Sequence, residues 1–239
     1  WAEAPSNLAD AFAALVASHP VDHAAWCRVP GLEIASLSPE RFFGLRGRTV
    51  TARPMKGTRG LVGASDRQRV ATMRELAESP KDRAENVMIV DLLRNDLGRI
   101  CAPGSVRVEG LWEVEEYRSV AQMTSTVRGE LAEGRDLWDA LAALFPPGSM
   151  TGAPKIAACR VLETLEVLPR GLYGGAIGWV EPSGDAEFSV VIRTLQSRAG
   201  QLRWDIGGGI VSDSTPAGEW AEAWAKAALL TPFADLGHA

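Results

Sequence analysis

Two glutamates and one lysine near the end of the chain have a spacing that can do chemistry. Glu219, Glu222 and Lys226 stand at positions i, i+3 and i+7, so a helix would place them on one face. Carboxylate oxygens are ligands that Mg²⁺ prefers, and the ammonium group can hold an anionic ligand. An exposed ion pair between Glu222 and Lys226 explains the same spacing and is a frequent arrangement.

Lysine is scarce in this chain, which draws attention to each one. Of the 25 basic residues only four are lysines, namely Lys56, Lys81, Lys155 and Lys226. Lysine, unlike arginine, can lose its proton and act as a nucleophile. Lys56 lies between Pro54 and Gly57, which predicts a fixed loop. A lysine held there and partly desolvated can attack carbon; the alternative is a solvated loop lysine.

Two further glutamates stand where a carboxylate can be partly buried. Glu40 precedes Phe42 and Phe43, and apolar neighbours favour the protonated form that a general acid needs. Glu85 begins an expected helix, on roughly the face of Leu92, so its carboxylate calls for a cation or a proton. A surface-turn glutamate and a first-turn glutamate that favours the helix dipole are the alternatives.

Two glycine-containing segments and one arginine can bind anions. Residues 149–155 (SMTGAPK) precede a helix, whose first N–H groups would point at an anion. The segment Gly207–Gly209 ends a strand and allows close approach of a ligand to the backbone. Neither segment is a nucleotide-binding signature. Arg193 stands among apolar residues in an expected strand, which indicates a buried carboxylate partner from the protein or from a ligand.

The elements that must position these residues are strands on either side of a helical block. Helical spacing predicts helices near 6–18, 70–78, 85–97, 137–145, 154–165 and 216–230. Strand patterns occupy 34–37, 41–45 and 49–52 before the block, and 175–181, 186–196 and 201–211 after it. This order predicts an α+β fold with antiparallel sheets, in one domain over residues 1–239.

Composition excludes several classes of protein. The chain has 239 residues, 46% of them hydrophobic and 23% charged, which is typical of a globular protein. No apolar run approaches the roughly 18 residues that span a bilayer. The net charge of -5 argues against nucleic acid as the main partner. The three cysteines form no disulfide pattern, so a reducing cytosol is expected.

Seven ordered segments resemble the chorismate-utilising enzymes, which include anthranilate, aminodeoxychorismate, isochorismate and salicylate synthases. The segments are SLSPERF, ARPMKGTRG, ENVMIVDLLRNDLGR, SMTGAPK, RGLYGGAIGW, VVIRT and GGGIVSDSTPAGEWAEAWAK. The resemblance extends from about residue 36 to residue 230. It implies an α+β fold of two packed antiparallel sheets flanked by helices. It also implies that the N-terminal part of a longer component I is missing here.

The resemblance assigns roles to individual residues. It implies that Glu40 is a general acid, and that Glu85 and Glu222, with Glu219, hold Mg²⁺ beside a carboxylate of chorismate. The residues implied to bind substrate are Thr58, Thr151, Gly152, Tyr173, Arg193, Gly207, Gly208, Gly209 and Lys226.

The loop around Lys56 separates the branches of the family. Its sequence PMKGT is similar to the PIKGT of aminodeoxychorismate synthases, whereas anthranilate synthases have an alanine in place of the lysine. This implies a cytoplasmic transferase in which Lys56 is the nucleophile and chorismate is aminated at C4, for 4-aminobenzoate and folate biosynthesis. The ammonia would come from a partner glutamine amidotransferase. The alternatives are an anthranilate synthase component I, an isochorismate synthase, or an inactive module that binds chorismate or a partner.

Overall fold

The computed structural model describes residues 2–3, 7–117, 120–212 and 214–227. The chain divides into two compact units. The first unit contains residues 1–40, 170–177 and 189–239, and the second contains residues 41–169 and 178–188. The single domain expected over residues 1–239 stays a prediction.

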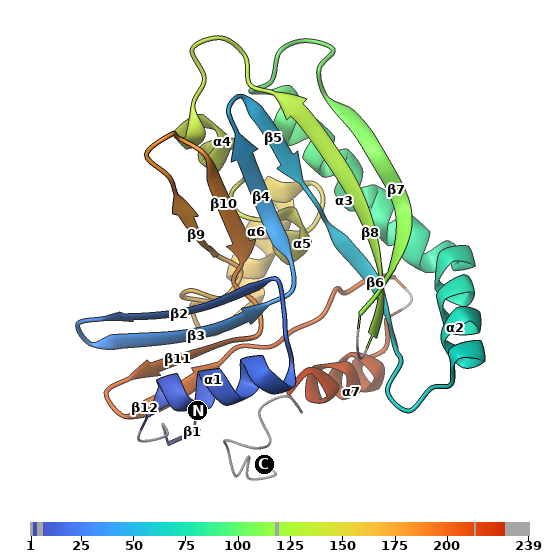
Figure 1. The fold of residues 1–239 in the computed structure, drawn as a ribbon, viewed down its shortest axis with the longest axis vertical. Coiled ribbons are helices and arrows are strands. Elements are labelled where there is room, and N and C mark those ends of the chain that lie inside the picture. Colours follow the sequence, from blue (N-terminus) through green and yellow to red (C-terminus); the bar gives the residue numbers. More distant parts are fainter. Residues whose placement is uncertain (1, 4–6, 118–119, 213, 228–239) are drawn as a thin grey trace. The chain divides into compact units, whose positions relative to one another are not determined.

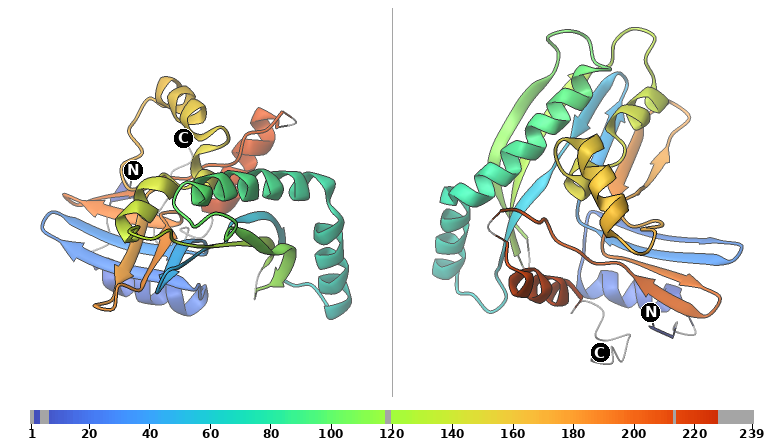
Figure 2. Two further views of the ribbon diagram at one scale, coloured as in Figure 1. Left: turned by 90° about the horizontal axis from the view of Figure 1, so that it is seen from above. Right: turned by 180° about the vertical axis from the view of Figure 1, so that it is seen from behind.

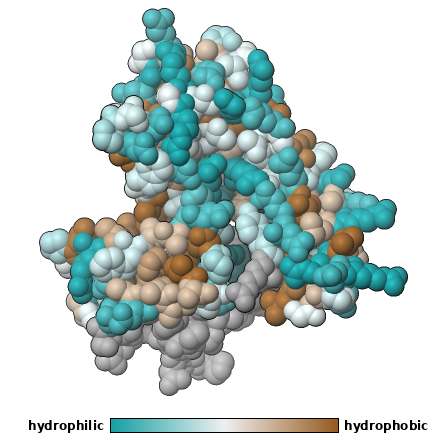
Figure 3. Space-filling view, in the orientation of Figure 1, coloured by the Kyte–Doolittle hydropathy of each residue, from teal (hydrophilic) through white to brown (hydrophobic). Residues whose placement is uncertain are grey.

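The first unit is built on a five-stranded antiparallel sheet in the order β1-β12-β11-β3-β2 (Figure 1). Its strands are β1 (Ala2–Glu3), β2 (His23–Val29), β3 (Leu32–Ser38), β11 (Thr194–Arg198) and β12 (Gln201–Trp204). On β2 the side chains of Trp26 and Val29 are exposed, and apolar surface gathers over this part of the molecule (Figure 3). The helix α7 (Pro216–Ala227) also belongs to this unit.

The helix α1 (Leu8–Ser18) provides the core of the first unit. Asn7 caps it, because its side-chain oxygen accepts a hydrogen bond from the N–H of Ala9 at 3.0 Å. The apolar face of α1 packs on β3, β11 and β12 through a cluster made of Leu8, Ala11, Leu15, Ala35, Leu37, Leu195 and Leu202. Burial of this face against the sheet supplies the driving force for the helix.

The second sheet has seven strands, and its main path runs β6-β8-β5-β4-β10-β9, with β7 paired to β8 (Figure 1). The strands are β4 (Arg41–Arg46), β5 (Thr49–Ala52), β6 (Met55–Gly60), β7 (Arg107–Glu116), β8 (Val120–Glu130), β9 (Ala176–Val180) and β10 (Ala186–Val190). The pair β7–β8 was not predicted from the sequence. Two register shifts interrupt that pair, one between Val108 and Gly110 and one between Gly110 and Glu113, and they blur the alternation that marks a strand.

The helices of the second unit follow the predicted block. They are α2 (Asp66–Glu78), α3 (Pro80–Gly98), α4 (Leu137–Leu144), α5 (Gly148–Thr151) and α6 (Lys155–Leu165). The long helix α3 lies along one face of the sheet and contacts β6, β7 and β8 (Figures 1 and 2). A smaller cluster of Leu61, Leu76, Ala121 and Met123 packs α2 on the same sheet.

The start of α3 differs from the prediction. Ser79 is the N-cap, with its hydroxyl accepting from the N–H of Asp82, and Pro80 occupies the first turn. The helix therefore begins five residues before Glu85, which lies in the second turn rather than the first. Interaction with the helix dipole therefore explains little about Glu85, because the stabilisation of a negative charge by the dipole falls off within the first turn.

The strand expected over residues 186–196 is two strands in two different sheets. β10 ends at Val190 in the seven-stranded sheet, and β11 begins at Thr194 in the five-stranded sheet. Arg193 stands in the break, with a φ of 49°, a left-handed conformation that is uncommon for a residue other than glycine. The prediction that Arg193 lies within a strand is therefore wrong, since strand-forming residues occur on both sides of Arg193 and do not reveal the change of sheet.

Two antiparallel sheets with helices confirm the predicted α+β class. Within the described residues, every helix is too short or too polar to span a bilayer.

Candidate active site

On α7 of the first unit, the predicted stripe of Glu219, Glu222 and Lys226 lies against the glycine segment. Lys226 Nζ donates to the carbonyl of Gly207 at 2.9 Å and lies 2.6 Å from Glu222 Oε1. A Cβ atom added at Gly208 would lie 2.6 Å from Glu219 Oε2 and 3.6 Å from Glu222 Oε1. Both carboxylates thus approach the backbone at a position where a side chain would block them.

One oxygen of this carboxylate pair lacks a partner. Glu219 Oε1 accepts from the hydroxyl of Ser214 at 2.6 Å, whereas Glu219 Oε2 is buried and has no hydrogen-bond partner among the described residues. A buried carboxylate oxygen without a partner is costly. This oxygen, together with Glu222, is a donor set of the kind that suits Mg²⁺. No three His, Cys, Asp or Glu side chains gather into a metal site within the part of the chain that is described.

Tyr173 is the third contact of the glycine segment. A Cβ atom at Gly207 would lie 3.0 Å from the Tyr173 hydroxyl oxygen. The guanidinium of Arg170 lies over the Tyr173 ring, 5.8 Å from its centroid. The prediction that Tyr173 and the glycine segment share a site is consistent with this contact, and their role in binding substrate stays a prediction.

Glu40 and Arg193 are electrostatic partners within the first unit. Burial lowers the pKa of the Arg193 guanidinium, and the negative charge of Glu40 works against that lowering. Glu40 is itself buried, at 7% exposure. The carboxylate partner expected for Arg193 is therefore found in the protein.

The backbone around both residues is fixed by hydrogen bonds. The N–H of Glu40 donates to the Ser38 hydroxyl at 3.3 Å, and its carbonyl accepts from the N–H of Val190 at 3.0 Å. The carbonyl of Arg193 accepts from the N–H of Leu37 at 3.0 Å. These bonds place Glu40 and Arg193 at the ends of β3 and β11.

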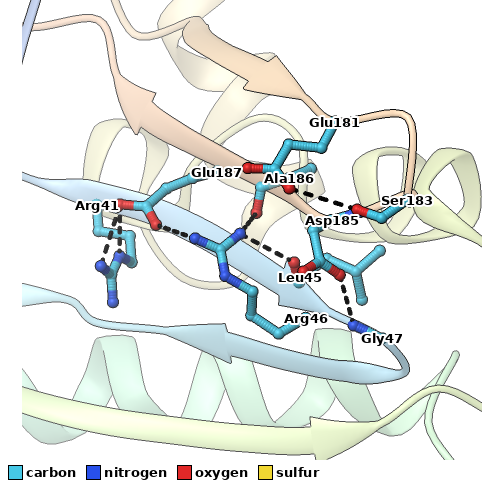
Figure 4. A network of polar contacts seen from close by, with 9 residues as sticks. All are labelled: Arg41, Leu45, Arg46, Gly47, Glu181, Ser183, Asp185, Ala186 and Glu187. Atoms are coloured by element: carbon cyan, nitrogen blue, oxygen red, sulfur yellow. Dashed lines mark hydrogen bonds and ion pairs between the residues drawn. The ribbon is translucent and has the colours of Figure 1, made fainter.

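Directly after Glu40, a network of charged side chains joins β4 to β10 in the second unit (Figure 4). Arg41 donates to Glu187 Oε1 from Nη2 at 3.0 Å, and Arg46 donates to Glu187 Oε2 at 3.4 Å. The Arg46 guanidinium also lies over the Trp179 ring at 4.9 Å. A carboxylate shared by two arginines fixes the start of β4, and hence the residue that follows Glu40.

Lys56 lies in a strand, so the prediction of a loop at this position is wrong. In the pairing of β6 with β8, Met55 faces Thr124 and Thr58 faces Gln122. Two residues of β6, Lys56 and Gly57, thus stand opposite a single residue of β8. This is a β-bulge, and Gly57 has the positive φ, 85°, that such a bulge uses. Proline and glycine are frequent both in loops and at strand irregularities, so the sequence alone does not distinguish the two.

Lys56 differs from the other lysines in its surroundings. Within the described residues, each of the other three lies within 4 Å of a carboxylate, whereas no such pair is found for Lys56. Lys56 is half-buried. Thr58, two residues further along β6, is exposed.

Glu85 on α3 is half-buried, with its side chain 22% exposed. Its nearest charged partner is Lys81, one turn earlier, at 3.9 Å. The inward orientation expected for Glu85 is thus seen in part, and its role as a metal ligand stays a prediction.

The SMTGAPK segment forms the short helix α5 and the start of α6. The hydroxyl of Thr151 donates to the carbonyl of Pro147 at 3.3 Å, and Gly152, with a φ of 117°, ends α5. Lys155 Nζ lies 2.6 Å from Asp96 Oδ2 and donates to the carbonyl of Leu144 at 2.6 Å. Lys155 therefore stabilises the packing of α3, α4 and α6, and carries a structural charge in this segment.

The predicted site residues fall into two sets. In the first unit the structure places Glu40, Tyr173, Arg193, Gly207, Gly208, Gly209, Glu219, Glu222 and Lys226. In the second unit it places Lys56, Thr58, Glu85, Thr151 and Gly152.

A family model described as chorismate binding enzyme matches residues 2–232. The chain belongs to the chorismate binding enzyme family. The resemblance found in the seven sequence segments is thereby confirmed.

Individual members of the chorismate binding enzymes match almost the whole chain. Anthranilate synthase component 1 of Streptomyces coelicolor is 46% identical over 84% of this chain and 39% of its own length. Aminodeoxychorismate synthase of Streptomyces pristinaespiralis is 45% identical over 96% of this chain and 32% of its own. The crystal structure of anthranilate synthase component I from Streptococcus pneumoniae has a TM-score of 0.86 and 34% identity, over 94% of this chain and 49% of that one. The chain thus spans between a third and a half of the length of these relatives and has the anthranilate synthase component I fold.

Three residues of this chorismate binding enzyme were missed by the sequence analysis. Asp82 contacts Gly57 beside Lys56, Asn86 follows Glu85 in the chain and is fully buried, and Asp96 forms an ion pair with Lys155. Burial of a charged or amide side chain cannot be read from a helix that is polar on several faces. Asn86 and Asp96 lie in the segment already singled out for Glu85, whereas Asp82 precedes that segment and carried no such signal.

Proposed function

We propose that this chain is the chorismate-binding catalytic part of an aminodeoxychorismate synthase component I. It aminates chorismate at C4 and gives 4-amino-4-deoxychorismate. The observation that carries the proposal is Lys56, a half-buried lysine that stands on a β-bulge and has no carboxylate partner among the described residues. Bulges re-aim side chains and are over-represented beside active sites.

Lys56 acts as the nucleophile. Its neutral amine forms a C–N bond with the ring of chorismate, and the bond between C4 and the hydroxyl oxygen breaks. Ammonia then forms the new C–N bond at C4 as the bond to Lys56 breaks, which returns the lysine. The half-buried position of Lys56 on a β-bulge, without a carboxylate partner among the described residues, supports this role, because an amine held in an ion pair is not available to attack carbon.

Glu40 acts as the general acid that protonates the departing hydroxyl. A general acid must hold its proton within reach of the departing oxygen. The burial of Glu40 supports the role. The hydrogen bonds to Ser38 and Val190 fix its backbone, so that the proton is delivered from a set position.

The remaining predicted residues bind the carboxylates of the substrate. Chorismate is a dianion, and a dianion needs cations and N–H donors in a partly buried site. Arg193 and Lys226 supply positive charge, Tyr173 supplies a hydroxyl, and Gly207–Gly209 supply backbone N–H groups. Thr58, Thr151 and Gly152 complete the set in the second unit.

The carboxylates of α7 fit Mg²⁺. The buried oxygen of Glu219 without a partner and the neighbouring Glu222 would hold it, with Glu85 as the ligand predicted from α3. The bound ion would neutralise a substrate carboxylate and increase the affinity for chorismate. Because Gly208 has no side chain, the carboxylates of Glu219 and Glu222 can lie close to the backbone there.

The amination also requires ammonia. We propose that a partner glutamine amidotransferase supplies it, and that the product serves 4-aminobenzoate and folate biosynthesis in the cytoplasm. The relatives called aminodeoxychorismate synthase, at 45% and 41% identity over more than nine-tenths of this chain, support this branch of the family.

The experiment is a mass-spectrometric product assay with chorismate, MgCl₂ and excess ammonium salt at mildly alkaline pH. It compares the wild-type chain with Lys56→Ala and with the control Arg67→Ala, which removes an exposed basic side chain. Aminodeoxychorismate from the wild type and the control, but not from Lys56→Ala, supports the proposal. Undiminished amination by Lys56→Ala contradicts the role of Lys56.

A second candidate is anthranilate synthase component I. It is favoured by the relative of that name at 46% identity. Formation of anthranilate in the same assay would select it, and isochorismate would select an isochorismate synthase. Unchanged chorismate, with a thermal shift on adding chorismate and Mg²⁺, would instead indicate a binding module without turnover.

A further inference from the structure

The strand segment that carries Lys56 is held against α3 at two points. One contact lies directly after Lys56, at Gly57, and the other lies two residues before it, at Pro54. The two contact residues on α3, Asp82 and Asn86, are four residues apart, so they lie on one face of the helix. Both contacts lie inside the second unit.

At the first point, the side chain of Asp82 packs on the backbone of Gly57. A Cβ atom added at Gly57 would lie 2.9 Å from both Cβ and Oδ1 of Asp82. Asp82 is nearly buried, at 7% exposure, and its Oδ2 accepts from Arg59 at 2.8 Å. Burial acts to lower the pKa of Arg59, but the hydrogen bonds to Asp82 and Glu75 outweigh it and raise the pKa. The arginine therefore stays charged, and it ties the end of the bulge to α3.

At the second point, a buried amide and a buried hydroxyl connect α3 to the start of β6. Asn86 Oδ1 accepts a hydrogen bond from the hydroxyl of Ser125, and neither residue is exposed. The N–H of Ser125 donates to the carbonyl of Pro54 at 3.2 Å. The hydroxyl of Ser125 also accepts from the N–H of Trp112 at 3.1 Å, so that β7 stabilises the same arrangement.

The bulge at Lys56 needs such support. Two residues of β6 stand opposite one of β8, so the ladder hydrogen bonds alone do not fix the direction of the lysine side chain. We infer that Asp82 is a positioning residue for Lys56, and that Asn86 provides the second point of the same clamp. This inference rests on the proposed function. The clamp also fixes Lys56 relative to Glu85, which lies between the two contact residues on α3.

The test compares Asp82→Ala with two matched variants in the ammonia-dependent amination of chorismate. Asp82→Ala removes the packing on Gly57 and the pair with Arg59, and we expect its kcat to fall by about 10- to 100-fold with little change in KM for chorismate. Asp82→Asn keeps the shape and an acceptor for Arg59, and is expected to recover kcat to within about threefold of the wild type. Glu75→Ala removes the exposed second partner of Arg59 and should leave kcat within about twofold.

Hydrogen exchange provides a readout that does not need activity. In Asp82→Ala the backbone amides of residues 56–58 should exchange at least about tenfold faster, while those of α6 and β5 keep their wild-type rates. Glu75→Ala should show no such local change. A uniform rise over the whole unit would mean general destabilisation and would overturn the positioning role, as would an unchanged kcat in Asp82→Ala.

The two proposals fail in different ways. If the wild type makes no aminodeoxychorismate, the proposed function fails, and the exchange of residues 56–58 alone decides whether the clamp exists. If the wild type aminates chorismate and Asp82→Ala does so equally well, the clamp is wrong and the function stands.

Discussion

Lys155 Nζ lies 2.6 Å from Asp96 Oδ2, with the two side chains only 13% and 5% exposed. The pair joins the first residue of α6 to the end of α3. Arg99 contacts the other oxygen, Asp96 Oδ1, at 3.1 Å. Lys155, the last residue of the SMTGAPK segment, thus has a structural role in the packing of the helices, and its charge is directed to Asp96 rather than to an anionic ligand.

We expect Lys155→Met to destabilise the chain. The variant leaves the buried Asp96 carboxylate with only Arg99 as a charged partner, and loss of a partner from a buried ion pair costs about 3 kcal/mol of unfolding free energy. Urea denaturation followed by circular dichroism measures the change. Arg94→Ala, which removes an exposed pair with Asp91, is the control and should cost at most about 0.5 kcal/mol. Equal stabilities of the two variants would refute the structural role of Lys155.

Gly57→Ala should be more destabilising than Gly63→Ala, although both glycines have a positive φ. Nothing lies within 4 Å of a Cβ atom at Gly63, so its replacement costs only the backbone strain of about 1–2 kcal/mol. At Gly57 the added methyl group also meets Asp82, which adds about 1–3 kcal/mol of overpacking. Thermal unfolding of the two variants measures the difference. Similar melting temperatures would contradict the contact.

Gly208→Ala should weaken binding of Mg²⁺ without unfolding the protein. The added methyl group would lie 2.6 Å from Glu219 Oε2, the buried oxygen without a partner, and would displace that carboxylate. Isothermal titration with MgCl₂ in the presence of chorismate measures the affinity, which we expect to fall by about tenfold, as for loss of a supporting contact at a metal site. Gly98→Ala, with nothing within 4 Å, is the control. An unchanged affinity for Mg²⁺ in Gly208→Ala would contradict the role of Glu219 as a metal ligand.

Arg193→Met should weaken chorismate binding. The variant removes a charged donor of the kind that pairs with carboxylates, and a charge-assisted hydrogen bond contributes about 1.5–3 kcal/mol. A loss of about 10- to 100-fold in affinity is therefore expected in an equilibrium titration, at 1.4 kcal/mol for each factor of ten. Arg198→Met, at the exposed end of β11, should bind like the wild type. A wild-type affinity in Arg193→Met would exclude the guanidinium from the site.

Cys101 should resist alkylation. Burial, aided by the negative charge of Glu130, raises the pKa of the Cys101 thiol. A raised pKa leaves less thiolate at any given pH, and the thiolate is the species that reacts. At pH 9, iodoacetamide should therefore modify Cys101 more slowly in the folded chain than in urea, as peptide mass spectrometry can show. Equal rates in the two states would contradict the burial.

The sequence by itself determined the family of this protein. The residue types and their order, from Glu40 and Lys56 to the pair Glu219 and Glu222, were enough to recognise the family. Helices with a clear apolar face, such as α1 and α4, were predicted to within a few residues. Short-range patterns of this kind survive in the sequence because a helix face or a cap is encoded by residues three or four apart.

Only the tertiary structure decided how those residues are held. The chain changes sheet between Val190 and Thr194, and the strand-forming residues on both sides of Arg193 give no sign of it. Lys56 lies on a bulge because β8 pairs with β6 out of register, and β8 is more than sixty residues away in the chain. The positioning role inferred for Asp82 and Asn86 depends on their contacts with the segment around that same strand. Contacts over such separations depend on how the elements pack, and local residue patterns carry no record of the partner that packing selects.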